Sequence, residues 1–279
     1  MYDTGTTSPE ALIAALDRQA EKFETPSGAG TMVWRAWGEG EPLMLTHGSH
    51  GSWVHWIRNI PHLAKTRRVL ACDMPGFGDS APPPAVDSAW PFAQIMAEGL
   101  SRLPFRTPID VMGFSIGAGV AAHMAAHAPE LVRRLIGVGM GGLGAPLGLG
   151  PMKRLSGLEG EARLAARRHN ILNLMLHAES SVDELALHIQ MMRPRYGKID
   201  PGLLVAPDKV LKVLPRVQAP VDVVFGEFDR PHGNPDLQVS LVRQSHPHAS
   251  LHVVPGAGHW ANYENPAAFH QIADALLAA

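Results

Sequence analysis

The pentapeptide Gly-Phe-Ser-Ile-Gly at residues 113–117 constrains the fold of this chain more than any other stretch. A short apolar run precedes it at residues 109–112, and an alanine-rich helical segment follows at 118–128. A strand that becomes a helix within one or two residues strains the backbone of the turning residue and requires small neighbours. The pattern therefore predicts that the Ser115 hydroxyl protrudes at the carboxyl edge of a sheet. The free N–H groups of the following helix would suit a developing oxyanion there.

Length and composition narrow the class of protein. The chain has 279 residues, enough for one large α/β domain or a domain with an insertion. A formal net charge of −2 gives no reason to expect nucleic acid or a membrane surface as a partner. The single Cys72 cannot form an internal disulfide, and we expect it to be a buried filler. No signal peptide or apolar run of about 18 residues is visible, which favours a cytoplasmic location.

Predicted strands and helices alternate along most of the chain. Helices are expected at residues 8–21, 53–65, 90–103, 118–128, 236–245 and 266–277. Strands are expected at 31–37, 42–46, 68–72, 109–114, 131–140, 221–225 and 250–254. This alternation predicts an α/β protein with a doubly wound, mostly parallel sheet.

The sequence pattern changes in residues 152–215, where it is helical and contains no convincing strand. A glycine-rich stretch at 141–151 marks the boundary before them. We therefore predict a core domain formed by residues 1–140 and 216–279, with residues 141–215 forming a helical cap inserted after the sixth strand. Such a cap would cover the carboxyl edge of the sheet, where open α/β sheets bind ligands.

An exposed serine is a weak nucleophile and needs a base, which in turn needs an acid to orient it. His259 follows the last predicted strand and Asp229 follows the strand before it, so both lie at the same sheet edge as Ser115. The order Ser, Asp, His along the chain is typical of a nucleophile elbow. We predict that His259 is the general base and Asp229 the acid that fixes its tautomer. Glu227 and Asp222 remain rivals for the acid.

The whole arrangement resembles the α/β-hydrolase superfamily from about residue 31 to the C-terminus. The motifs that carry this resemblance are His47-Gly48, the loop 73–80 (Asp-Met-Pro-Gly-Phe-Gly-Asp-Ser), the elbow, residues 226–230 (Gly-Glu-Phe-Asp-Arg) and Gly258-His259-Trp260. The resemblance implies an oxyanion hole formed by the backbone N–H groups of Ser49 and Ile116. His50 is the alternative to Ser49 as the residue that donates from the loop after the predicted strand 42–46.

The resemblance implies a serine hydrolase that forms an acyl-enzyme on a small carboxylic ester. The first alternative is hydrolysis of a carbon–carbon bond in a ring-cleavage product. Such hydrolases often carry Gly-Asn-Ser at the elbow and His-Trp at the base, so Trp260 fits and Phe114 does not. They also place an arginine near the acidic substrate, a role open to Arg193 or Arg195. The second alternative is a receptor on the same fold, although a complete triad favours an enzyme.

The expected partner is a small-molecule substrate, and the sequence leaves a homodimer open. We predict that side chains around the elbow and in the cap contact the substrate: His50, Trp53, Phe114, Met175, Met192 and Trp260. No metal or organic cofactor is expected, because the chain lacks cysteine clusters, H-E-x-x-H and an opening G-x-G-x-x-G. The histidines at 47, 50 and 55 have no neighbouring carboxylate, whereas zinc sites usually gather three or four ligands.

Overall fold

A computed structural model describes residues 8–192, 195 and 199–278 of the protein. These residues form one eight-stranded sheet with the strand order β1-β2-β4-β3-β5-β6-β7-β8. The pairs β1–β2 and β2–β4 are antiparallel, and every other neighbouring pair is parallel. The strands are β1 (Glu21–Ser27), β2 (Gly30–Trp37), β3 (Glu41–Thr46), β4 (Arg67–Cys72), β5 (Ile109–Phe114), β6 (Val132–Val138), β7 (Val221–Gly226) and β8 (Leu251–Val254). The fold is the predicted doubly wound, mostly parallel α/β sheet.

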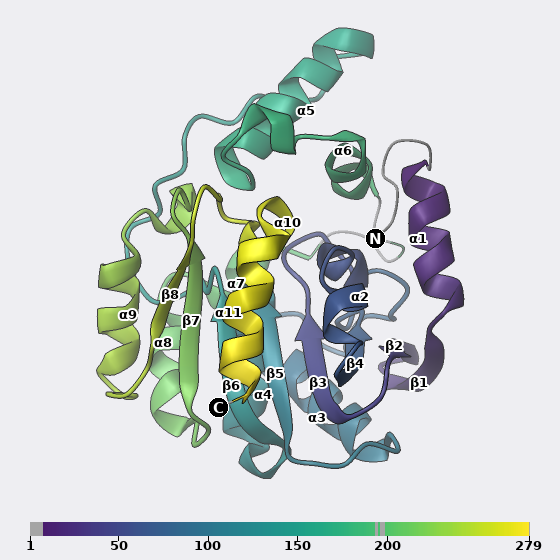
Figure 1. The fold of residues 1–279 in the computed structure, drawn as a ribbon, viewed down its shortest axis with the longest axis vertical. Helices are drawn as coiled ribbons and strands as arrows, with labels where there is room; N and C mark the ends of the chain where they lie inside the picture. The colour runs from purple at the N-terminus through teal and green to yellow at the C-terminus, as the bar shows by residue number, and fades with distance from the viewer. Residues whose placement is uncertain (1–7, 193–194, 196–198, 279) are drawn as a thin grey trace.

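Helices cover both faces of the sheet (Figure 1). Helices α2 and α11 lie on one face, and α3, α4 and α8 lie on the other. The helices are α1 (Pro9–Arg18), α2 (Ile60–Leu63), α3 (Trp90–Arg102), α4 (Ile116–His127), α5 (Gly160–Leu174), α6 (Glu184–Met191), α7 (Pro201–Val205), α8 (Lys209–Val213), α9 (Pro235–Arg243), α10 (Ala261–Glu264) and α11 (Pro266–Ala278). Short 3-10 turns join several of them.

The central strand β5 explains why the elbow stands where it does. Every residue of β5 is buried, as expected of a parallel strand covered on both faces. Successive side chains alternate between the faces: Val111 packs with α3 and α4, whereas Met112 and Phe114 pack on the α11 side. The strand leads directly into α4, so its carboxyl end and the N-terminus of α4 meet at Ser115.

Two local predictions from the sequence were wrong. The strand β1 was not predicted, because its sequence is polar and only Thr25 and Ser27 are buried. It is an edge strand, where Pro26 is tolerated. The helix predicted over 53–65 is instead a 3-10 turn, Trp53–Trp56, followed by the four-residue helix α2.

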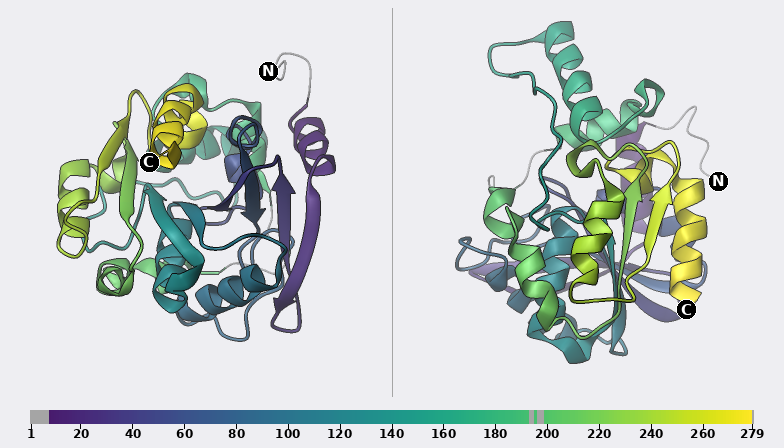
Figure 2. Two further views of the ribbon diagram at one scale, coloured as in Figure 1. Left: turned by 60° about the horizontal axis from the view of Figure 1, so that its bottom comes forward. Right: turned by 90° about the vertical axis from the view of Figure 1, so that its left-hand side faces the viewer.

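Helices α5 and α6 stand beyond the carboxyl ends of the strands, and α5 projects away from the sheet (Figure 2). Helices α7 and α8 lie within the predicted cap range, yet they pack against α4 and contribute Leu204, Val210 and Val213 to the core on that face. The last part of the range 141–215 therefore belongs to the packing of the sheet domain. Within the described residues, no helix is both long and apolar enough to cross a membrane.

Candidate active site

Ser115 has the strained backbone that the elbow requires. Its φ is +54° and its ψ is −120°, which is unusual for a residue with a side chain. A Cβ on Gly113 would lie 2.5 Å from the Cα of Ala118, and a Cβ on Gly117 would lie 2.4 Å from the carbonyl oxygen of His47. Both contacts are too short for a real side chain, so glycine at these two positions lets strand, helix and neighbouring loop meet at Ser115.

The structure brings the three predicted catalytic side chains together. The Nε2 atom of His259 lies 3.0 Å from the Oγ of Ser115. The Nδ1 atom of the same ring lies 3.0 Å from the Oδ2 of Asp229. Because a carboxylate can only accept, the proton of neutral His259 is on Nδ1, and Nε2 is free to accept the serine proton.

Asp229 and His259 are packed into a buried pair. Asp229 is 2% exposed and His259 is 4% exposed. Burial by itself would raise the pKa of Asp229, but the charge of His259 and hydrogen bonds from His232 and His259 bring that pKa well below its usual range. Asp229 is thus ionised at neutral pH. A Cβ on Gly139, at a φ of +55°, would lie 2.9 Å from Nδ1 of His259, so glycine there makes room for the pair.

The two rival acids point elsewhere. Glu227 is exposed and its carboxylate accepts a hydrogen bond from the backbone N–H of Gly256. Asp222 lies within β7 and accepts hydrogen bonds from the backbone N–H and the hydroxyl of Ser250. Among these three acids, only Asp229 is hydrogen-bonded to His259.

The loop after β3 lies beside the elbow. Two buried histidines hold it: His47 donates from Nδ1 to the carbonyl of Gly48, and His55 accepts from the N–H of Gly48. Burial lowers the pKa of both rings, so they are neutral supports. The backbone N–H groups of Ser49 and Ile116 donate no hydrogen bond to any other described residue. Both groups are therefore unpaired within the described part of the chain.

The aromatic side chains predicted to bind substrate are largely covered. Trp53 is 4% exposed, and Phe114 and Trp260 are fully buried. Phe114 lies 5.1 Å from the His259 ring, centroid to centroid, and Trp260 donates from Nε1 to the carbonyl of His55. These three rings therefore present little surface to a ligand. His50, by contrast, is exposed in the loop and has a φ of +54°.

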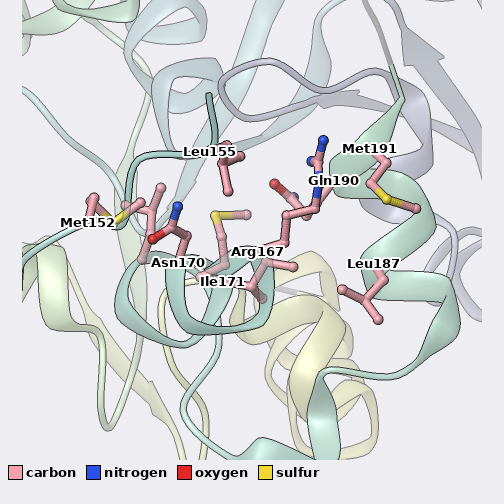
Figure 3. A pocket seen from close by; sticks show the side chains of 10 residues that line it. Met152, Leu155, Arg167, Asn170, Ile171, Leu187, Gln190 and Met191 are labelled. Carbon is pink, nitrogen blue, oxygen red and sulfur yellow. The ribbon is translucent and has the colours of Figure 1, made fainter. Parts of the chain in front are cut away.

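A cavity lies at the helices α5 and α6, and none of its lining residues belongs to the triad. Its volume is about 140 Å³, and it is bounded by α5, α6 and the segment before α5 (Figure 3). Its lining is mostly apolar: Met152, Leu155, Arg167, Asn170, Ile171, Leu174, Met175, Leu187, Gln190 and Met191. Met175 is thus in the lining, whereas Met192 is 41% exposed and outside it. Arg193 lies outside the described residues, and Arg195 is not part of this cavity.

The segment that follows α5 is joined to the loop that carries His259. The backbone N–H of Trp260 donates to the carbonyl of Met175 over 2.7 Å. The Glu264 carboxylate accepts from the backbone N–H groups of His177, Ala178 and Gly258 at 2.7–3.0 Å. One end of the cavity lining is therefore fixed next to the proposed base.

Metal ligation is the remaining chemistry to consider. In the described ranges, the one cluster of suitable side chains close enough to share an ion is Asp229, His232 and His259. These groups already hydrogen-bond to one another, and an ion held by them would occupy the Nδ1 side of His259. The histidines at 47, 50 and 55 do not form such a cluster.

Sequence reasoning missed three residues of this site. Gly139, His232 and Glu264 make close contacts to the triad or its loops. The sequence signal for Gly139 was a glycine near the end of a predicted strand, and the signal for His232 was a histidine three residues after the expected acid. Neither indicates by itself which way a side chain points.

Comparison with known proteins identifies the family of this chain. Residues 41–169 match the α/β hydrolase fold family. The 2-hydroxymuconate semialdehyde hydrolase of Pseudomonas sp. strain CF600 is 32% identical over 253 residues, which are 86% of this chain and 88% of that protein. The 2-hydroxy-6-oxo-6-phenylhexa-2,4-dienoate hydrolase of Burkholderia cepacia is 29% identical over 269 residues, covering 86% of this chain and 89% of that protein.

Solved structures show the same fold. A thermophilic esterase from Thermogutta terrifontis superposes with a TM-score of 0.72 at 22% identity, covering 93% of this chain and 98% of that one. The chain belongs to the α/β-hydrolase fold family, and it is an enzyme of the hydrolase class.

Proposed function

We propose that this enzyme is a serine hydrolase that cleaves a small carboxylic ester through an acyl-enzyme. The continuous hydrogen-bonded chain from Ser115 through His259 to Asp229, with 3.0 Å at each step, carries the proposal. Nucleophile and base are within hydrogen-bond reach, and a third group orients the base. The residues thus meet the geometric criteria for a nucleophilic triad.

In the first half of the reaction, His259 removes the proton of Ser115 as its Oγ attacks the ester carbonyl. The charge on the carbonyl oxygen would be stabilised by the N–H groups of Ile116 and Ser49, which have no partner among the described residues. His259 then gives the proton to the departing alcohol. Asp229 stays ionised and stabilises the imidazolium.

In the second half, His259 removes a proton from water, which attacks the acyl carbonyl. Collapse of this intermediate returns the proton to Ser115 and releases the acid. The balance is one ester and one water consumed, with one alcohol and one carboxylic acid formed. No redox step is needed, and the chain's own residues supply every proton transfer.

The nucleophile is tested with Ser115→Ala. We expect loss of ester hydrolysis on the order of a million-fold, because removal of a triad nucleophile has an effect of this size. Labelling by a fluorophosphonate should also disappear, while the circular dichroism spectrum and melting temperature stay close to those of the parent enzyme. Labelling that persists in this variant would show that another residue is the nucleophile.

Hydrolysis of a carbon–carbon bond is the second candidate, and the relatives named above favour it. They act on 2-hydroxymuconate semialdehyde and on a 2-hydroxy-6-oxo-dienoate. In this chain, the same triad would act on the 6-oxo carbonyl of such an acid. The elbow of this chain carries Phe114 at the position where carbon–carbon hydrolases of ring-cleavage products often carry asparagine. This residue keeps the ester as the leading substrate.

A substrate panel separates the two candidates. Values of kcat/KM are measured for p-nitrophenyl esters of increasing acyl length and for a 2-hydroxy-6-oxo-dienoate, with Ser115→Ala as the blank for each. We expect the best ester to exceed the dienoate. A dienoate value about tenfold above the best ester, a difference of about 1.4 kcal/mol in barrier, would make carbon–carbon hydrolysis the function instead.

A further inference from the structure

A second buried histidine contacts the acid of the triad. His232 ends the 3-10 turn Arg230–His232, directly after Asp229, and is 5% exposed. Its Nδ1 lies 3.1 Å from Asp229 Oδ1, and its backbone N–H donates to the same oxygen over 3.1 Å. Its ring centroid lies 5.1 Å from that of His259. The carboxylate is therefore held between two imidazoles.

The two oxygens of Asp229 have separate partners. Oδ1 accepts twice from His232, and Oδ2 accepts from His259. Because the carboxylate is ionised and only accepts, the Nδ1 of His232 carries a proton. The His232 ring thus fixes the rotation of the carboxylate, and this rotation decides whether Oδ2 faces His259.

The surroundings of His232 leave it few other roles. Its Nε2 lies 3.5 Å from where a Cβ on Gly141 would be, and its ring packs against Phe225. The Arg230 guanidinium, on the same turn, is turned to the side-chain oxygen of Asn173. The titratable groups that the described contacts bring to the ring are Asp229 and His259. Among the described residues, the side chain of His232 has one hydrogen-bond partner, the carboxylate of Asp229.

We propose that His232 is a positioning residue for the reaction: it orients the Asp229 carboxylate and takes up part of its negative charge. This inference rests on the proposed function, since it requires that the triad performs the chemistry. A hydrogen bond to one oxygen reduces the negative charge available to the other. With the Nδ1 donor removed, more of that charge would stabilise protonated His259, while the backbone N–H of His232 would still hold the carboxylate loosely.

The test compares two substitutions at one position. His232→Phe keeps a planar ring without the donor, whereas in His232→Asn the side-chain amide can still donate near the place of Nδ1. We expect kcat of the Phe variant on the best ester to fall about 10- to 100-fold with KM within about threefold, since small misplacements of catalytic groups have effects of this order. We also expect the acid limb of its kcat/KM profile to move to higher pH by roughly half a unit. The Asn variant should recover most of both quantities.

The matched control is His123→Phe. His123 is also buried, its Nδ1 faces the carbonyl of Gly119, and it lies on α4 away from the triad. This variant should keep the parent kcat and acid limb, whatever its melting temperature. The positioning role would be overturned if His232→Phe and His232→Asn lost the same factor in kcat. It would also be overturned if the acid limb of His232→Phe stayed in place or moved to lower pH. Hydrolysis or labelling that survives in Ser115→Ala would instead overturn the proposed function, so the two failures are distinguishable.

Discussion

Three N–H groups converge on the carboxylate of Asp229: the backbone and ring of His232 and the ring of His259. An amide at this position would place one N–H against another of these donors. We therefore expect Asp229→Asn to lose about 10⁴-fold in kcat, because the His259 tautomer with its proton on Nδ1 is no longer favoured. Initial rates on the best ester under saturating conditions measure this loss.

Glu227→Gln is the control for this acid, because Glu227 bonds only to the backbone of Gly256 among the described residues. It should keep kcat close to the parent value. Near-parent activity of Asp229→Asn together with an inactive Glu227→Gln would show that Glu227, and not Asp229, is the acid of the triad.

Residues of the site differed in how far the sequence could identify them. Ser115 was identifiable because its turn is built from adjacent residues whose glycines have a local steric cause. Asp229 and His259 were identifiable because parallel strands end at one edge of the sheet. The choice between Asp229 and Glu227, and the contact from His232, depend on side-chain directions that the sequence does not contain.

At the scale of elements, α5 borders the cavity and leads into the contact with the loop of His259. Met175 follows α5, is 8% exposed, and lines the cavity, while its backbone carbonyl binds the N–H of Trp260. Met175→Ala would enlarge the cavity and keep this backbone contact. We expect the preference among p-nitrophenyl esters to move to longer acyl chains, with each methylene worth about 1–3 kcal/mol in kcat/KM.

Met192→Ala serves as the control, since this side chain is 41% exposed and not part of the cavity lining. Its acyl-chain ranking should match that of the parent enzyme, and the acetate ester should react at a similar rate in both variants. If Met175→Ala lowered kcat/KM by the same factor on every ester while remaining folded, the cavity would have no part in specificity.

The sequence predicted some helices and strands better than others. Most helices and strands were predictable from the pattern of apolar residues, and so was the helical nature of residues 152–215. The packing of α7 and α8 on α4 was not, because an amphipathic helix has the same pattern whether it faces a cap or a core. The strand β1 was missed because an edge strand with mostly exposed side chains has little apolar pattern at all.

At the scale of the whole molecule, buried histidines should make stability depend on pH. Burial lowers the pKa of His47, His55 and His123, and it brings that of His270 to about 4. In the unfolded chain these groups titrate near pH 6.5. Below this pH the unfolded state binds protons that the folded state does not, so the free energy of unfolding falls as the pH is lowered.

His55 gives the sharpest test of this linkage, because its ring is 1% exposed and its pKa lies well below the ordinary value. Urea unfolding is measured between about pH 7.5 and pH 5, where His55→Gln should weaken the pH dependence by up to about 1.4 kcal/mol per pH unit, one proton's worth. The slope is compared, so a constant loss of stability in the variant does not matter. His127→Gln, at an exposed position on α4, should keep the parent slope. A parent-like slope in His55→Gln would mean that this ring takes up its proton equally well in the folded and unfolded chain.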